Sequence, residues 1–187
     1  MRYLLVCFLL FVSQTVYAAM PLTPSFVATD GEGSTCTEIA PCTLAYANTN
    51  AEAGDTVNIR AGTYNTAIDP SASGTEGAGR IIYQAYGSEE VIITDVAIAL
   101  YLKYNDYIKV DGITFDGTVG TIERLFLISH GATYNEITNC TFIGKGTVSN
   151  PMLWDGETTG GTPCTNNWIP PCYSCSYERS QFQIDRR

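Results

Sequence analysis

The chain has little positive charge and almost no histidine. Its 187 residues include 10 Lys and Arg against 19 Asp and Glu, with a single His and a formal net charge of −9. So acidic a surface is a poor match for nucleic acid or an anionic membrane, and we expect neither as a partner. A polysaccharide partner or bound cations are compatible with it. An acidic polysaccharide would need a local basic groove or Ca²⁺ bridges.

The chain also lacks an apolar run long enough to cross a membrane. The N-terminal run, Tyr3–Val12, is much shorter than the roughly 20 residues that a span requires. It follows Arg2 and precedes small residues ending at Ala18, a pattern typical of a secretory signal peptide over residues 1–18 rather than of a membrane anchor. We therefore expect a secreted protein, extracellular or periplasmic, with about 170 residues left to form one domain.

Helical periodicity is scarce, whereas short β-rich runs recur. Residues 106–117 match residues 133–144 at an offset of 27 residues. A repeat of this period predicts a solenoid whose coils stack about 4.8 Å apart. The apolar runs Ile81–Tyr86 and Thr56–Ile59 predict two earlier coils. The matched pairs are Tyr107 with Tyr134, Val110 with Ile137, Ile113 with Cys140, Thr114 with Thr141, Phe115 with Phe142 and Gly117 with Gly144.

A specific motif precedes these coils. Residues 25–64 include Pro41-Cys42-Thr43-Leu44, then Gly54-Asp55-Thr56-Val57, and end in Gly62-Thr63-Tyr64. The stretch resembles the N-terminal cap and first coil of secreted right-handed parallel β-helix proteins, notably those similar to chondroitinase B and alginate lyase. A short helix over Pro41–Asn50 would cover the open edge of the first coil, with Leu44 and Ala45 or Ala47 on one face.

We therefore predict an all-β fold, a right-handed parallel β-helix of about three to four coils with an N-terminal cap helix. An antiparallel β-sandwich is the alternative. The expected boundaries are a signal peptide over 1–18, a cap over 19–55 and coils over 56–148. Residues 149–187 are rich in Gly and Pro, and we expect an irregular tail there, in a chain that stops short of further coils.

The resemblance implies a polysaccharide lyase that acts by β-elimination, in which a Lys or Arg side chain of lowered pKa takes the C5 proton of a uronate in its uncharged form. Lys109 and Arg124 are the candidate catalytic residues. Lys109 lies opposite Glu136 at the repeat offset, so a surface ion pair is the favoured explanation for it. Asp111, Asp116 and Asp155 are candidate Ca²⁺ ligands, although Asp beside Gly is first of all a turn residue.

These candidates do not make a complete lyase site, so we expect this chain alone to be inactive on polysaccharide. His130 follows Ser129 but has no matching Asp for a hydrolase triad. The functional hypotheses are the N-terminal part of a polysaccharide-processing protein or of a polysaccharide-binding one. A non-catalytic surface or adhesin-type repeat protein is the alternative.

Six cysteines follow the expected signal peptide, and in a secreted protein they predict disulfides. Cys36 and Cys42 flank a short loop and form the most natural pair. Cys172 and Cys175 have a C-x-x-C spacing, but without a second such pair a zinc site is disfavoured. Cys140 takes the place of Ile113 in the repeat, which indicates a small buried side chain. Asn139 begins a formal glycosylation sequon and matches the turn residue Gly112.

Overall fold

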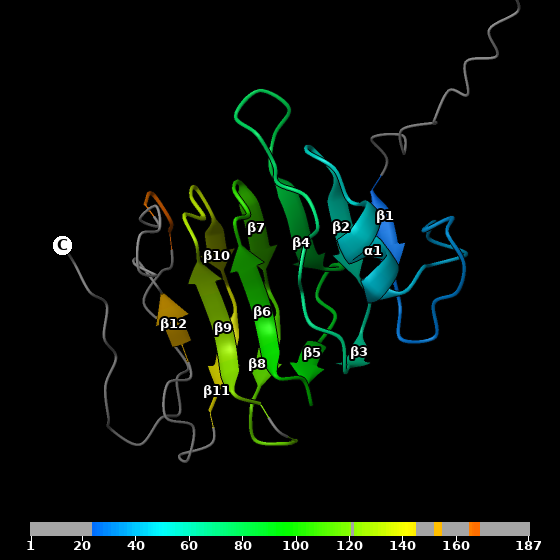
Figure 1. Cartoon of the computed structure of the whole chain (residues 1–187). Helices are drawn as coiled ribbons and strands as arrows, with labels where there is room; N and C mark the ends of the chain where they lie inside the picture. Colours follow the sequence, from blue (N-terminus) through cyan, green and yellow to red (C-terminus); the bar gives the residue numbers. More distant parts are fainter. Residues whose placement is uncertain (1–23, 121, 145–151, 155–164, 169–187) are drawn as a thin grey trace, which may run out of the picture.

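The computed structural model describes residues 24–120, 122–144, 152–154 and 165–168. The strands form three sheets in which every pairing is parallel, and the chain winds through them as a β-helix of about three turns (Figure 1).

Sheet A has the order β1-β2-β4-β7-β10 and holds β1 (Ser25–Val27), β2 (Thr56–Ile59), β4 (Ile81–Ala85), β7 (Ile108–Asp111) and β10 (Glu136–Thr138). Sheet B has the order β11-β8-β5-β3 and holds β3 (Gly62–Tyr64), β5 (Val91–Thr94), β8 (Thr114–Asp116) and β11 (Thr141–Ile143). Sheet C has the order β12-β9-β6 and holds β6 (Ile98–Lys103), β9 (Arg124–Ser129) and β12 (Met152–Trp154).

The register confirms the predicted repeat. Val110 pairs with Ile137 and Phe115 pairs with Phe142, both at the offset seen in the sequence. The two phenylalanine rings stack with centroids 5.0 Å apart and planes within 9°. The same offset joins β4 to β7, whereas β2 meets β4 with Val57 opposite Tyr83, one residue shorter. The parallel pairing rules out the antiparallel sandwich.

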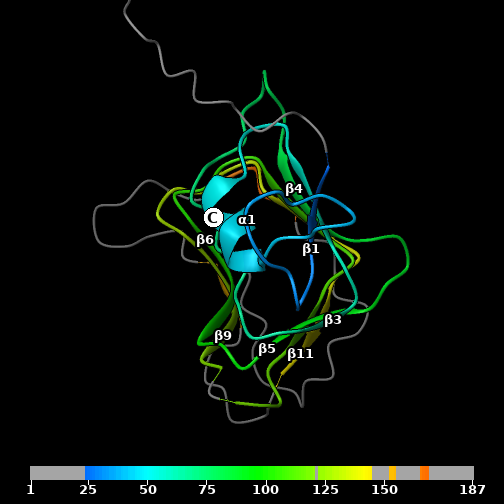
Figure 2. The ribbon, with the colours of Figure 1, turned by 90° about the vertical axis from the view of Figure 1, so that its right-hand side faces the viewer.

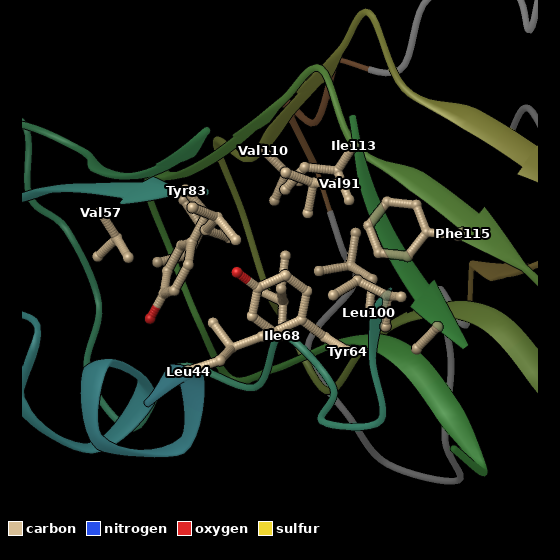
Figure 3. Packing of buried hydrophobic residues seen from close by; sticks show 14 of the residues in the cluster. Leu44, Val57, Tyr64, Ile68, Tyr83, Val91, Leu100, Val110, Ile113 and Phe115 are labelled. Carbon is tan, nitrogen blue, oxygen red and sulfur yellow. The ribbon is translucent and has the colours of Figure 1, made fainter. Parts of the chain in front are cut away.

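The core fills the space enclosed by the three sheets (Figure 3). In sheet A the inward column consists of Val57, Tyr83, Val110 and Ile137, all buried. Strand residues alternate between the two faces of a sheet, so equivalent positions on successive coils form continuous apolar columns. Burying each such side chain contributes about 1.5–3 kcal/mol. The columns therefore fix the register of one coil on the next.

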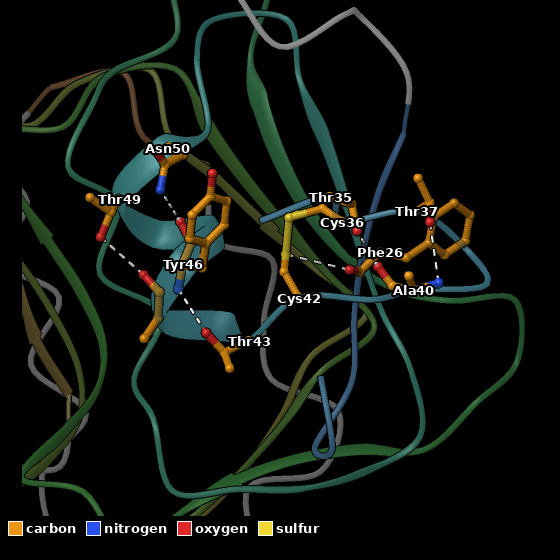
Figure 4. The surroundings of a disulfide bond; sticks show 11 residues. Phe26, Thr35, Cys36, Thr37, Ala40, Cys42, Thr43, Tyr46, Thr49 and Asn50 are labelled. Atoms are coloured by element: carbon orange, nitrogen blue, oxygen red, sulfur yellow. Dashed lines mark hydrogen bonds between the residues drawn. A yellow bond between two sulfur atoms is a disulfide. The ribbon is translucent and has the colours of Figure 1, made fainter. Parts of the chain in front are cut away.

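The N-terminal end is closed by α1 (Leu44–Asn50), as expected (Figure 2). The helix starts later than Pro41 because Thr43 is its N-cap, with the Thr43 hydroxyl accepting a hydrogen bond from the Tyr46 amide at 3.1 Å. Leu44 and Ala47 are buried against the first coil, whereas Ala45 is exposed. Figure 4 shows the confirmed Cys36–Cys42 disulfide beside the helix. By reducing the chain entropy of the unfolded state, a disulfide that closes so short a loop contributes about 2 kcal/mol to the free energy of unfolding.

The parallel pairing extends beyond the coils expected at 56–148. β1 lies within the segment assigned to the cap, yet it forms the first strand of sheet A. β12 lies in the tail expected to be irregular, yet it pairs with β9 in sheet C. Trp168 forms an isolated parallel bridge with Glu136. These departures have one reason: a strand of three residues, or a single bridge, is too short to leave a periodic pattern among Gly and Pro.

No helix among the described residues is long and apolar enough to cross a membrane. The expected signal peptide, residues 1–18, lies outside the described residues, as do Asp155, Cys164, Cys172 and Cys175.

Candidate functional site

The outer face of sheet A carries a cluster of charged side chains. Lys109 of β7 and Glu136 of β10 occupy paired positions, with Lys109 Nζ 3.2 Å from Glu136 Oε1. Lys109 Nζ also lies 3.5 Å from Asp111 Oδ2, and Arg80 Nε lies 3.7 Å from Glu136 Oε2. The ion pair expected from the repeat offset is therefore present. Both cations of this cluster are neutralised by neighbouring carboxylates.

The surroundings of Lys109 keep its amine charged. Partial burial lowers its pKa, but hydrogen bonding and attraction from Glu136, together with Asp111, outweigh the burial and leave the pKa above its ordinary value. A general base must lose its proton near the working pH. At neutral pH the Lys109 amine is instead a fixed hydrogen-bond donor on the face of the sheet.

Beside this face, where the chain passes from sheet C to sheet A, four aromatic residues form a corner. The aromatic corner consists of Tyr104 and Tyr107, between β6 and β7, and of His130 and Tyr134, between β9 and β10. All four have left-handed backbones, with φ of 63°, 54°, 59° and 57° respectively. Bulky residues rarely adopt this conformation, which costs roughly 1–2 kcal/mol.

The rings of the aromatic corner contact one another across successive coils. Tyr107 and Tyr134 stack with centroids 4.7 Å apart and planes within 12°. Tyr104 packs edge-on against His130 at 4.8 Å. The Arg80 guanidinium lies 5.8 Å from the Tyr107 ring centre and donates a hydrogen bond to the Tyr134 carbonyl. Arg80 therefore binds the aromatic corner to the charged cluster on sheet A.

A ladder of asparagines supports the aromatic corner from inside. Asn135 is buried; its Oδ1 accepts from the Ile108 amide at 2.9 Å and its Nδ2 donates to the Asn105 carbonyl at 2.8 Å. Asn105 is also buried, and its Nδ2 donates to the Pro70 carbonyl at 2.8 Å. Asn167 continues the ladder, with its Oδ1 accepting from the Asn135 amide at 2.8 Å. These bonds satisfy buried backbone groups next to the aromatic corner and fix the backbone there.

The loop between β3 and β4 lies beside the aromatic corner and projects beyond the sheets in Figure 1. The Gly74 amide donates to the Asp106 carbonyl at 2.9 Å, and the Asp106 amide donates to Ser73 Oγ at 3.0 Å. An ideal Cβ on Gly74 would lie 2.4 Å from the Tyr107 carbonyl oxygen, so only glycine allows this close approach.

Three aromatic side chains in this region are well exposed. Tyr104 is 63 % exposed, Tyr134 is 41 % exposed and Trp168 is 61 % exposed. Trp168 bridges to Glu136 in parallel, and its carbonyl accepts a hydrogen bond from the Ile137 amide at 3.0 Å. It therefore continues the outward column of Lys109 and Glu136 into the next coil. We call the aromatic corner together with Arg80, Lys109, Asp111, Glu136 and Trp168 the candidate surface.

The structure does not bring the two expected catalytic cations together. Arg124 begins β9 in sheet C, whereas Lys109 lies in β7 of sheet A. The two side chains belong to different faces of the β-helix. A catalytic role for either residue stays a prediction.

The expected Ca²⁺ ligands serve other contacts. Asp111 pairs with Lys109, and its Oδ1 accepts a hydrogen bond from Asn139 Nδ2 at 2.7 Å. Asp116 ends β8 in sheet B, and its Oδ1 accepts from both the amide and the hydroxyl of Thr118. Within residues 24–120, 122–144, 152–154 and 165–168, no three His, Cys, Asp or Glu side chains are grouped so as to hold a metal ion.

Asn139 and Cys140 occupy the next turn, between sheets A and B. Asn139 is exposed and left-handed at φ 52°, matching Gly112 at φ 73°, as the repeat predicted. Cys140 is half-buried, less than its partner position Ile113, and its Sγ donates to the Val110 carbonyl at 3.7 Å. Burial raises the pKa of the Cys140 thiol to about 12, which keeps it protonated and unreactive at neutral pH.

Sequence reasoning missed most of the candidate surface. Tyr107 and Tyr134 appeared in the repeat, but nothing marked them as more than coil residues. Tyr104 and His130 are 26 residues apart, one fewer than the offset of the main repeat, so the repeat alignment does not pair them. Trp168 lies in a segment without a periodic pattern. A second alignment, shifted by one residue, would pair Tyr104 with His130, but it would not find Trp168.

Comparison with known proteins adds little to these observations. No protein-family model matches the chain, and no solved structure matches it. The uncharacterized protein YwoF of Bacillus subtilis is 44% identical over 57 residues, which is 30% of this chain. The chain covers 12% of that protein's length.

Proposed function

We propose that this chain is a polysaccharide-binding β-helix of a secreted protein, and that the candidate surface is its binding site. The observation that carries the proposal is the aromatic corner. Four aromatic residues hold strained left-handed backbones where glycine or asparagine would serve the fold better. Strain of this kind is concentrated at functional sites.

The chemistry of the candidate surface suits a sugar chain. Aromatic rings pack against the apolar C–H face of a pyranose, while its hydroxyls require donors and acceptors at the rim. Here Tyr104, Tyr134 and Trp168 supply exposed rings. Lys109 and Glu136 supply a donor and an acceptor on a rigid sheet. Preorganised groups of this kind lower the entropy cost of binding.

The signal-peptide pattern and the family resemblance support the same function. The N-terminal 18 residues have the pattern of a signal peptide, which would deliver the protein to where polysaccharides lie. The cap motif resembles β-helix proteins that process polysaccharides. Binding is proposed ahead of lyase chemistry because the amine of Lys109 stays charged and Arg124 lies on another sheet.

Affinity electrophoresis in gels containing soluble polysaccharides tests the proposal. The panel comprises alginate, chondroitin, polygalacturonate, xylan, galactomannan and mixed-linkage β-glucan. We expect at least one polymer to retard the protein, and the variant Tyr104→Ala/Tyr134→Ala/Trp168→Ala to lose the retardation. The matched control is Ile39→Ala/Val119→Ala, which removes exposed apolar side chains outside the candidate surface.

Circular dichroism would check that both variants keep the fold of the unmodified protein. Equal retardation of the two variants, or no retardation of the unmodified protein by any polymer, would contradict the proposed function.

A further inference from the structure

Two cations of the candidate surface, Arg80 and Lys109, are already paired: they share the carboxylate of Glu136, and Lys109 also meets Asp111. A third cation, Lys103, lies beside the aromatic corner with its Nζ 5.3 Å from the Tyr104 ring centre, a cation–π contact. Arg80 is further occupied by the Tyr107 ring and the Tyr134 carbonyl. A uronate carboxylate entering the surface would have to displace one of these contacts.

Carboxylates also lie near the aromatic corner. Asp106 lies between Tyr104 and Tyr107, and its Oδ1 accepts from the amide and the hydroxyl of Thr133. Burial raises the pKa of the Tyr107 phenol, and the negative charges of Glu76 and Asp106 raise it further, against an opposing effect of Arg80. Glu76 and Asp106 therefore act on the Tyr107 hydroxyl in the sense opposite to Arg80.

From this charge pattern we infer that the candidate surface binds a neutral polysaccharide, built of uncharged pyranose units, and discriminates against polyuronates. The inference rests on the proposed function and specifies its ligand class. Each uronate unit of an acidic chain would bring a carboxylate to a surface whose cations already pair with carboxylates or pack against an aromatic ring. A neutral pyranose brings only C–H faces and hydroxyls.

The strand register places an aromatic side chain next to a hydrogen-bonding side chain, as binding of a polysaccharide requires. Trp168 bridges to Glu136, so its backbone lies about one strand spacing, roughly 4.8 Å, from that of Glu136. A pyranose packed on Trp168 can donate its hydroxyls to the Glu136 carboxylate, and charged acceptors make the stronger hydrogen bonds. The charge of Glu136 thus favours neutral sugars and excludes acidic ones at the same point.

Affinity electrophoresis with the purified full chain distinguishes the ligand classes. The neutral polymers are xylan, galactomannan and mixed-linkage β-glucan, and the acidic ones are alginate and polygalacturonate, each with and without CaCl₂ at low and high NaCl. We expect retardation by at least one neutral polymer, unchanged by salt, and none by the acidic polymers. Trp168→Ala should weaken the neutral binding about tenfold, whereas Ile39→Ala should not.

Glu136→Gln provides the sharper test, because it keeps an acceptor and removes the carboxylate that Arg80 and Lys109 share, which leaves Asp111 as the one carboxylate still paired with Lys109. We expect this variant to keep neutral binding within about threefold and to gain salt-sensitive retardation by alginate or polygalacturonate. Acidic polymers that bind the unmodified protein more tightly than neutral ones would overturn the inference while leaving the proposed function standing. Retardation by no polymer at all would overturn both.

Discussion

Two corners of the β-helix solve the same geometric problem with different residues. Between sheets A and B the chain turns through Gly112 in one coil and Asn139 in the next, both left-handed. Gly and Asn adopt this conformation at little cost. Between sheets C and A the left-handed positions are held by Tyr104, Tyr107, His130 and Tyr134.

The difference separates what the fold needs from what it merely tolerates. The first corner shows that a left-handed turn in this β-helix requires no aromatic side chain. The aromatic corner accepts backbone strain and exposes rings, and its stacking returns only about 0.5–1.5 kcal/mol per pair. The first corner is therefore explained by the fold alone, whereas the aromatic corner is where we propose that recognition takes place. The following predictions would break or sharpen that distinction.

The largest effect should come from Asn135→Ala, which removes the support of the aromatic corner. The side chain is buried and bonds the Ile108 amide and the Asn105 carbonyl, so both backbone groups would lose their partner. We expect the free energy of unfolding to fall by about 3 kcal/mol. Urea denaturation followed by circular dichroism measures this value. Asn65→Ala, at an exposed position, is the control and should change it by less than about 0.5 kcal/mol.

At the structural corner, Gly112→Val should destabilise the protein by about 2 kcal/mol because a β-branched residue strains a backbone at φ 73°. Gly112→Asn should cost less than about 1 kcal/mol, since Asn139 already fills the equivalent position. An ideal Cβ here lies 3.5 Å from the Ala85 Cβ, an ordinary contact, so the effect is one of backbone strain. Thermal unfolding of the two variants compares them. Equal stability of both would show that strain is unimportant at these turns.

At the aromatic corner, the double variant Tyr107→Asn/Tyr134→Asn should change stability by less than about 1 kcal/mol. Relief of backbone strain offsets the lost stacking of the two rings. Polysaccharide binding should fall about tenfold in the same variant. Urea titration and affinity electrophoresis on one preparation give both values. Strong destabilisation with unchanged binding would make this corner structural as well.

The smallest effect should come from Lys109→Met, which breaks a partly exposed ion pair. We expect a loss below about 1 kcal/mol at neutral pH, because solvent screens the pair and Arg80 still contacts Glu136. The folded pKa of Lys109 is raised, so its stabilisation is complete below the ordinary value of 10.5 and is lost as pH rises through the folded value. Unfolding free energies of both proteins, measured from neutral to alkaline pH, should therefore converge only above 10.5.

The repeat, the cap helix and the Cys36–Cys42 disulfide could all be predicted from the sequence, because each leaves a local or periodic signal. Sheet C could not. Its strands β6 and β9 pair with Leu100 opposite Phe126, one residue short of the main repeat, and the turns before them vary in length. The ion pair of Lys109 with Glu136 followed from the repeat, whereas Trp168 could be placed on the same face only through its bridge to Glu136.

The sequence by itself determined the parallel stacking of coils, because identical inward positions recur at a fixed distance and apolar columns allow one register. Tertiary structure alone decided which outward residues share a surface. Tyr104, Tyr134 and Trp168 lie far apart in the chain, and each is an unremarked exposed aromatic when read singly. Winding of the chain brings Tyr104 against His130 of the next coil, Tyr134 against Arg80, and Trp168 beside Glu136, since residues one coil apart become neighbours about 4.8 Å away.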